Sequence, residues 1–109
     1  MEINKIYTKI EQLISSITPD EGKEAIFSAR IYENITEYEF SWLLENDEED
    51  YYKMGDDSAD EVFYKLIELL KTLQKDMVSK NEPWTHCKIT LSDKGEFNIE
   101  FADIPQEDS

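Results

Sequence analysis

The side chains that could perform chemistry in this chain are few, and their spacing argues against catalysis. The single histidine and the single cysteine, His86 and Cys87, are adjacent in the sequence. Neighbouring residues of a strand point to opposite faces, so a strand at this position would keep them from acting as base and nucleophile. Gly22, Gly55 and Gly95 are scattered over separate turns and cannot build a glycine-rich phosphate loop. We therefore expect a protein that is not an enzyme and uses no cofactor.

The acidic stretch 56–61 is the one candidate for a metal site. Its sequence, Asp-Asp-Ser-Ala-Asp-Glu, offers carboxylates that calcium could use. It lacks the alternating ligand spacing and the central glycine of an EF-hand loop, so we expect no metal site. Ser58 and Glu61 instead fit a capping box, in which each side chain accepts a hydrogen bond from a backbone N–H at a helix start.

Charge is the strongest feature of the composition. The 109 residues carry 26 acidic and 11 basic side chains, a net charge of −15. Residues 21–50 hold a net −8 and residues 81–109 a net −5, whereas 1–20 and 51–80 hold −1 each. General solubility would explain an acidic chain, but it does not explain this concentration in two blocks. A surface of this kind repels nucleic acid and anionic lipid and attracts basic proteins, so we expect no direct nucleic-acid or membrane binding.

Hydrophobic periodicity predicts an α+β fold with the order helix, three strands, helix, two strands. Apolar residues at steps of three and four predict one helix over 3–17 and another from Ser58 to a point before Pro83. Alternating residues predict strands at 25–31, 38–42, 51–54, 87–91 and 97–101. The expected architecture is a single domain, residues 1–109, in which both helices pack on one face of an antiparallel sheet, with a frayed tail over 102–109.

Further expectations concern the core and the cellular location. Trp84, next to Pro83, is placed to cover the end of the second helix, so we expect it to be buried. A lone cysteine rules out an intramolecular disulfide and fits a reducing compartment. The N-terminus lacks the basic and apolar regions of a signal peptide, so we expect a cytoplasmic protein.

The predicted partner-binding surface joins acids on the open face of the sheet to the acidic loop after Leu44. With the apolar strand positions turned to the helices, the outward positions carry acids together with Arg30, Lys88 and Asn98. The acidic loop continues directly from them in sequence, which predicts one extended negative surface. Its members are Glu37, Glu39, Glu45, Asp47, Glu48, Glu49, Asp50, Asp56, Asp57, Glu96 and Glu100.

The segment 58–101 resembles the C-terminal half of the YezG/EsaG family of bacterial antitoxins. The resemblance rests on an amphipathic helix that leads into Asn81-Glu82-Pro83-Trp84-Thr85, and on a hairpin with Gly95-Glu96-Phe97 after the turn. The N-terminal helix, with Ile6-Tyr7 and Ile17-Thr18-Pro19, is similar to the family more weakly. Residues 20–57 match in pattern alone, the tryptophan expected soon after Pro19 is absent, and the tail 102–105 departs from the usual acidic, tyrosine-containing ending.

This resemblance implies an immunity protein that neutralises the nuclease domain of a toxin exported by type VII secretion. The charge argument agrees independently, because a nuclease site is basic and an acidic surface can occupy it. Two alternatives stay open. One is an acidic secretion chaperone, which shares the element order but needs a final helix for which this chain leaves no room. The other is an acidic adaptor that binds a basic or unfolded partner segment.

Overall fold

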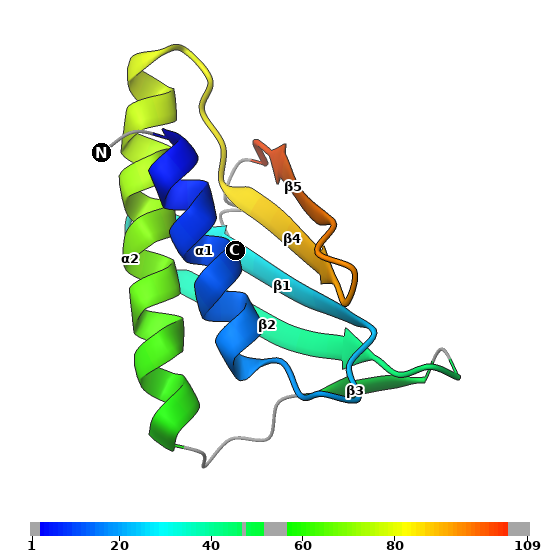
Figure 1. The fold of residues 1–109 in the computed structure, drawn as a ribbon. Helices are drawn as coiled ribbons and strands as arrows, with labels where there is room; N and C mark the ends of the chain where they lie inside the picture. Colours follow the sequence, from blue (N-terminus) through cyan, green and yellow to red (C-terminus); the bar gives the residue numbers. More distant parts are fainter. Residues whose placement is uncertain (1–2, 47, 52–56, 105–109) are drawn as a thin grey trace.

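A computed structural model of the protein describes residues 3–46, 48–51 and 57–104. In chain order its elements are α1 (Ile3–Ile17), β1 (Glu24–Ile31), β2 (Thr36–Leu43), β3 (Glu49–Tyr51), α2 (Asp57–Ser79), β4 (His86–Ser92) and β5 (Phe97–Ala102). The strands form one antiparallel sheet in the order β3-β2-β1-β4-β5. Both helices cover the same face of this sheet (Figure 1). The predicted α+β fold is confirmed.

β1 is the central strand and is paired along its whole length on the β2 side. Phe27 lies opposite Phe40 of β2 and Ile89 of β4, so the three strands share one register. Every second side chain of β1, from Ala25 to Ile31, is buried toward the helices, as the period-two pattern of a one-sided sheet requires.

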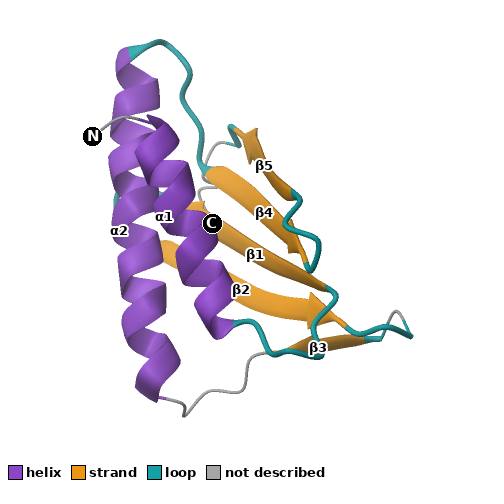
Figure 2. Cartoon of the chain, viewed as in Figure 1, coloured by secondary structure: helices purple, strands orange, loops and turns teal. Residues whose placement is uncertain are grey.

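The two helices bury their apolar stripes against this layer, and they run antiparallel to each other (Figure 2). The fully buried side chains of α1 are Ile6, Ile10 and Ile14, and those of α2 with least exposure are Phe63, Leu66, Leu70 and Leu73. The Phe63 ring lies 6.2 Å from the Phe27 ring and 5.0 Å from the Tyr38 ring, centroid to centroid. Removal of this apolar surface from water is the main force that holds the two layers together.

Local boundaries differ from the sequence prediction in two places. The third strand is Glu49–Tyr51, earlier than the predicted 51–54, and residues 52–54 lie outside the described chain. Acids have low strand propensity, which favoured a loop for 49–50, but a short strand at a sheet edge tolerates charge well. α2 begins at Asp57, one residue before the predicted cap Ser58, whose side chain is not among those described.

Local interactions stabilise α2 and the turn between β4 and β5. Glu61 pairs with Lys65 at 3.6 Å within α2, and Asp76 of α2 pairs with Lys80, the residue after the helix, at 3.1 Å. Gly95 has a φ of 84° in the tight turn between β4 and β5, a conformation that glycine adopts without steric cost. No helix in the described ranges is long and apolar enough to cross a membrane.

The segment between α2 and β4 is fixed by Trp84 and Gln74. Trp84 is only 2% exposed, which confirms the predicted burial, and its ring centroid lies 5.1 Å from that of Phe101. The Gln74 amide nitrogen donates to the carbonyls of Ile31, at 3.1 Å, and of Trp84, at 2.8 Å. One side chain of α2 therefore ties together the end of β1 and the entry to β4.

The expected tail begins in ordered structure. Ala102 is the last residue of β5, and the Ile104 backbone N–H donates to the Thr85 hydroxyl oxygen at 2.9 Å. The Tyr32 hydroxyl in turn donates to the Ile104 carbonyl at 3.0 Å. Residues 105–109, the remainder of that segment, lie outside the described chain.

Trp84→Ala is expected to lower the free energy of unfolding by about 3–5 kcal/mol, because a truncated core tryptophan leaves a cavity. Chemical denaturation measures this change. The matched control is Tyr64→Ala, at a position that is 73% exposed, which should change the value by about 0.5 kcal/mol or less. Equal effects of the two substitutions would contradict a core role for Trp84.

Candidate interaction surface

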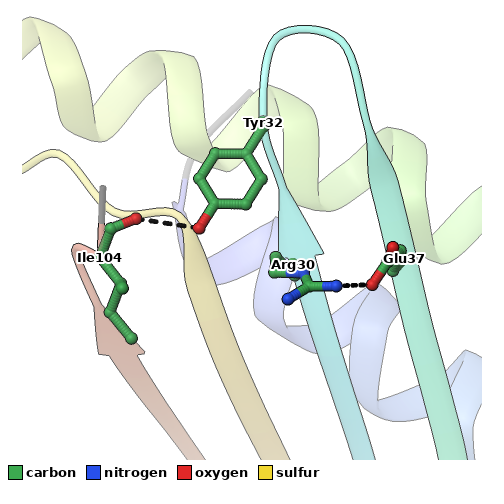
Figure 3. Close-up of polar contacts among 4 residues, drawn as sticks. All are labelled: Arg30, Tyr32, Glu37 and Ile104. Carbon is green, nitrogen blue, oxygen red and sulfur yellow. Dashed lines mark hydrogen bonds and ion pairs between the residues drawn. The ribbon is translucent and has the colours of Figure 1, made fainter. Parts of the chain in front are cut away.

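The face of the sheet opposite the helices carries acids and bases in alternation. In one row across the strands, Arg30 stands between Glu37 and His86. In the next row, Lys88 lies directly opposite Glu100 on β5. Arg30 and Glu37 form an ion pair (Figure 3). Both side chains are about half exposed, so this pair contributes about 1 kcal/mol or less to stability, and its main consequence is local charge balance.

A shallow hollow of about 520 Å³ lies over these rows, bordered by side chains of β1, β2, β4 and β5. His86 forms part of its border, with Nδ1 2.8 Å from the Thr85 hydroxyl oxygen. The Tyr32 ring meets the His86 ring edge-on, at 5.9 Å between centroids. Among the described residues, no group of three or more histidine, cysteine or acidic side chains could hold a metal ion.

His86 and Cys87 belong to opposite faces of β4. His86 lies beside Arg30 on the open face, whereas Cys87 lies beside Ala29 and is buried. Burial raises the pKa of the Cys87 thiol from about 9.0 to about 12, although a backbone hydrogen bond at Ala29 opposes part of this rise. The thiol is therefore protonated at neutral pH and is not poised as a nucleophile.

We predict that Cys87 in the folded protein reacts with an aromatic disulfide reagent about a thousandfold more slowly than in the unfolded chain at pH 8, in proportion to the lost thiolate. The unfolded chain in guanidinium chloride is the control. Comparable rates in the two states would show an accessible, ionisable thiol.

The same rise in the pKa of Cys87 makes the free energy of unfolding depend on pH. The contribution of the protonated thiol is intact below about pH 9 and is lost as the pH rises toward 12.

A second group of acids lies at the end of the sheet where β1 begins, at the right-hand side of Figure 1. Glu24, the first residue of β1, pairs with Leu43 on one side and with Ser92 on the other. This register brings together the loop before β1, the turn after β2 and the turn after β4. Backbone bonds join them, from Lys23 N to the Leu43 carbonyl at 2.6 Å and from Asp93 N to the Lys23 carbonyl at 2.8 Å.

We call this region the acidic loop end. Its exposed acids are Asp20, Glu21, Glu45, Glu48, Glu49, Asp93 and Glu96, and the described bases among them are Lys23 and Lys94. Four of these acids, together with Lys23 and Asn46, border a concave surface of about 550 Å³. Like charges held this close produce a strong local negative potential, which favours a cationic partner.

Gly22 allows the loop before β1 to sit this close to the sheet. The residue is buried, and its N–H donates to the Pro19 carbonyl at 2.9 Å. A β-carbon here would lie 3.0 Å from Thr18 Cγ2 and 3.1 Å from the Pro19 carbonyl oxygen. Both distances are shorter than ordinary van der Waals contact, so glycine is needed for the backbone to turn beside Trp42. This turn places Asp20 and Glu21 next to the start of β1.

The predicted partner-binding residues fall into two groups. Glu45, Glu48, Glu49 and Glu96 lie at the acidic loop end, whereas Glu37, Glu39 and Glu100 lie on the open face toward the other end of the strands. Asp50 is half-buried in β3, opposite Trp42. Asp47 and Asp56 lie outside the described residues, and Asp57 begins α2 with a side chain that is not described.

The two groups are well separated. Along β2, Glu39 is four positions from Leu43, a rise of roughly 13 Å, and Glu37 is six positions away, roughly 20 Å. The row between them holds Ser41, Ile26, Thr90 and Asn98, none of which is charged. The acids of the open face and those of the loops therefore present separate surfaces to a partner.

Sequence reasoning missed Asp20, Glu21 and Asp93 as members of this surface. Each lies in a short connection, where a single acid does not indicate a binding surface. They become neighbours of Glu45 only because β1 is placed between β2 and β4. The hairpin that contains Gly95 was predicted, but its position in the sheet depends on that strand order.

The chain is a small α+β domain with exposed acids grouped at one end of its sheet. Its histidine and its cysteine, His86 and Cys87, lie on opposite faces of β4. The family model described as "Immunity protein YezG-like" matches residues 3–108, and the chain belongs to this family. The resemblance seen in the sequence is thereby confirmed, and the expected partner is a cognate toxin. No curated protein matches the chain significantly.

Proposed function

We propose that this immunity protein neutralises the nuclease domain of a cognate secreted toxin by placing the acidic loop end against the domain's nucleic-acid-binding surface. The observation that carries the proposal is the meeting of three connections at one end of the sheet, where seven of the described acids are exposed. A nuclease must attract a polyanion, so its substrate-binding surface is basic. An acidic protein surface competes for the same place.

The acidic loop end is the better candidate of the two acidic surfaces. It carries seven exposed acids against two bases, whereas the open face carries Glu37, Glu39 and Glu100 against Arg30 and Lys88. Interleaved charges of opposite sign cancel at distances beyond their spacing, and solvent ions screen the remainder over about 8–10 Å. The loop end therefore supplies most of the long-range attraction between the two proteins.

Neutralisation in this proposal is steric and electrostatic, and the chain makes or breaks no bond. Long-range attraction raises the association rate, and close contact then excludes the nucleic acid from the site. A toxin exported by type VII secretion is made inside the cell, which places its antitoxin in the cytoplasm beside it. The expected outcome is an inactive complex of fixed stoichiometry.

The combined substitution Glu21→Lys, Glu45→Lys and Asp93→Lys is expected to slow association with the toxin's nuclease domain by about tenfold or more and to flatten its dependence on salt. Each residue comes from a different loop of the acidic loop end. Stopped-flow association at several salt concentrations measures this. In the parallel cleavage assay, the unaltered chain should abolish nuclease activity near molar equivalence, and the variant should require an excess.

The matched control is Glu33→Lys, Glu68→Lys and Glu82→Lys, which changes the net charge equally at exposed positions away from the loop end. It should change the association rate by about threefold or less. Equal slowing by both sets would mean that net charge matters and location does not. Turnover of nucleic acid by the purified chain itself would disprove the proposal.

A further inference from the structure

Within the described ranges, the outer edge of β5 is an open strand edge. β5 is the last strand of the sheet, and among the described residues no strand pairs with its outer side. Its register with β4 is unbroken from the Leu91–Phe97 pair to the His86–Ala102 pair, so it contains no bulge. The strand also contains no proline and no lysine. Natural sheets use these devices, or very short edge strands, to prevent pairing with other chains.

The alternation of hydrogen bonds between β4 and β5 shows which residues of β5 direct their backbone groups to the outer edge. Ser92 N donates to the Glu96 carbonyl at 2.9 Å, so this is a hydrogen-bonded pair at the head of the hairpin. Hydrogen-bonded and non-bonded pairs alternate in an antiparallel ladder. The backbone groups of Asn98, and of every second residue after it, therefore form hydrogen bonds with β4. Phe97, Ile99 and Phe101 direct their backbone N–H and C=O groups to the outer edge.

The same three residues carry the apolar side chains of β5, and each is half-buried against the core. The Phe97 ring lies 6.1 Å from the Tyr7 ring of α1, and Phe101 contacts Trp84. A further antiparallel strand on this edge would place every second side chain beside them, on the helix side of the sheet. Its remaining side chains would lie on the open face, where Glu100 is exposed.

The charge of this edge selects its occupant. Glu96, Glu100 and Asp103 are exposed along and beside β5, and no base occurs from Gly95 to Ile104. A second copy of the chain would bring the same acids and a further net charge of −15 to the edge. An added strand with basic residues opposite Glu100 is attracted instead, since opposite charges on facing strand positions stabilise the pairing.

We propose that β5 accepts an extended segment of the toxin as an added antiparallel strand, in which apolar residues alternate with lysine or arginine. This is strand addition at a sheet edge, where main-chain hydrogen bonds supply affinity and alternate side chains supply specificity. The identity of the partner rests on the proposed function, whereas the docking edge itself is tested without any toxin.

The test uses the peptide Lys-Val-Lys-Val-Lys-Val-Lys, labelled with a fluorophore, and measures its binding by anisotropy. In the proposed register the valines lie opposite Phe97, Ile99 and Phe101 and donate their N–H groups to β5. N-methylation of the three valine nitrogens should weaken binding by about tenfold or more, because it removes those bonds. N-methylation of the backbone nitrogens of the last three lysines should change binding by about threefold or less, because these N–H groups point away from β5. Equal binding of the two methylated peptides would overturn the proposal.

Variants of the protein test the same edge from the other side. Ile99→Pro removes one outward N–H and leaves the bonds to β4 in place, whereas Ile99→Ala removes the side chain and keeps that N–H. We expect Ile99→Pro to weaken peptide binding more than Ile99→Ala does. If Ile99→Pro fails to fold, the pair of methylated peptides on the unaltered protein still decides the question. Self-association of the unaltered chain in sedimentation, lost in Ile99→Pro, would show that a second copy occupies the edge and would overturn the assigned occupant.

The two proposals can fail separately. Peptide binding that shows the predicted methylation pattern, in a protein that does not inhibit the nuclease, would retain the docking edge and reject the proposed function. Stoichiometric inhibition with no difference between the methylated peptides would retain the function and reject the docking edge.

Discussion

The rest of the structure depends on the pairing of β1 with a strand on each side. Because Glu24 pairs with both Leu43 and Ser92, the connections at that end of the sheet must meet. Because every second residue of β1 is buried, the strand cannot slip by one position without turning Phe27 and its in-phase neighbours into water. The register that builds the core therefore also fixes where the acids of the loops lie.

Charge and packing are divided between different parts of the molecule. The helix face of the sheet holds the apolar core. Lys65 of α2 and Lys80, just after the helix, form local pairs with acids of α2. The loops at the start of β1 carry the unbalanced acids. Their mutual repulsion costs stability, which the large apolar core offsets. The acids at this end of the sheet share one direction, and the backbone that carries them is held by hydrogen bonds to the sheet.

The sequence predicted the element order, the one-sided sheet and the buried Trp84, because each follows from a local pattern. It did not place β3 correctly, since acids in a short edge strand look like a loop. Gln74 could not be recognised, because its two carbonyl partners, Ile31 and Trp84, are brought together only by the fold. For the candidate surface, the acidic loop after Leu44 was identified, but its neighbours Glu21 and Asp93 were not. The order of the strands brings Glu21 and Asp93 next to this loop, and strand order cannot be predicted from a local sequence pattern.

In the proposed function, the acidic loop end is the surface that meets the toxin. Amide hydrogen exchange of the chain, alone and in complex with the toxin's nuclease domain, tests it most directly, because a bound partner slows the exchange of the backbone amides that it covers. We predict that exchange slows at residues 20–23, 44–46 and 93–96 while the outward faces of α1 and α2 are unchanged. Slower exchange on the helices, with those loops unaffected, would contradict the account.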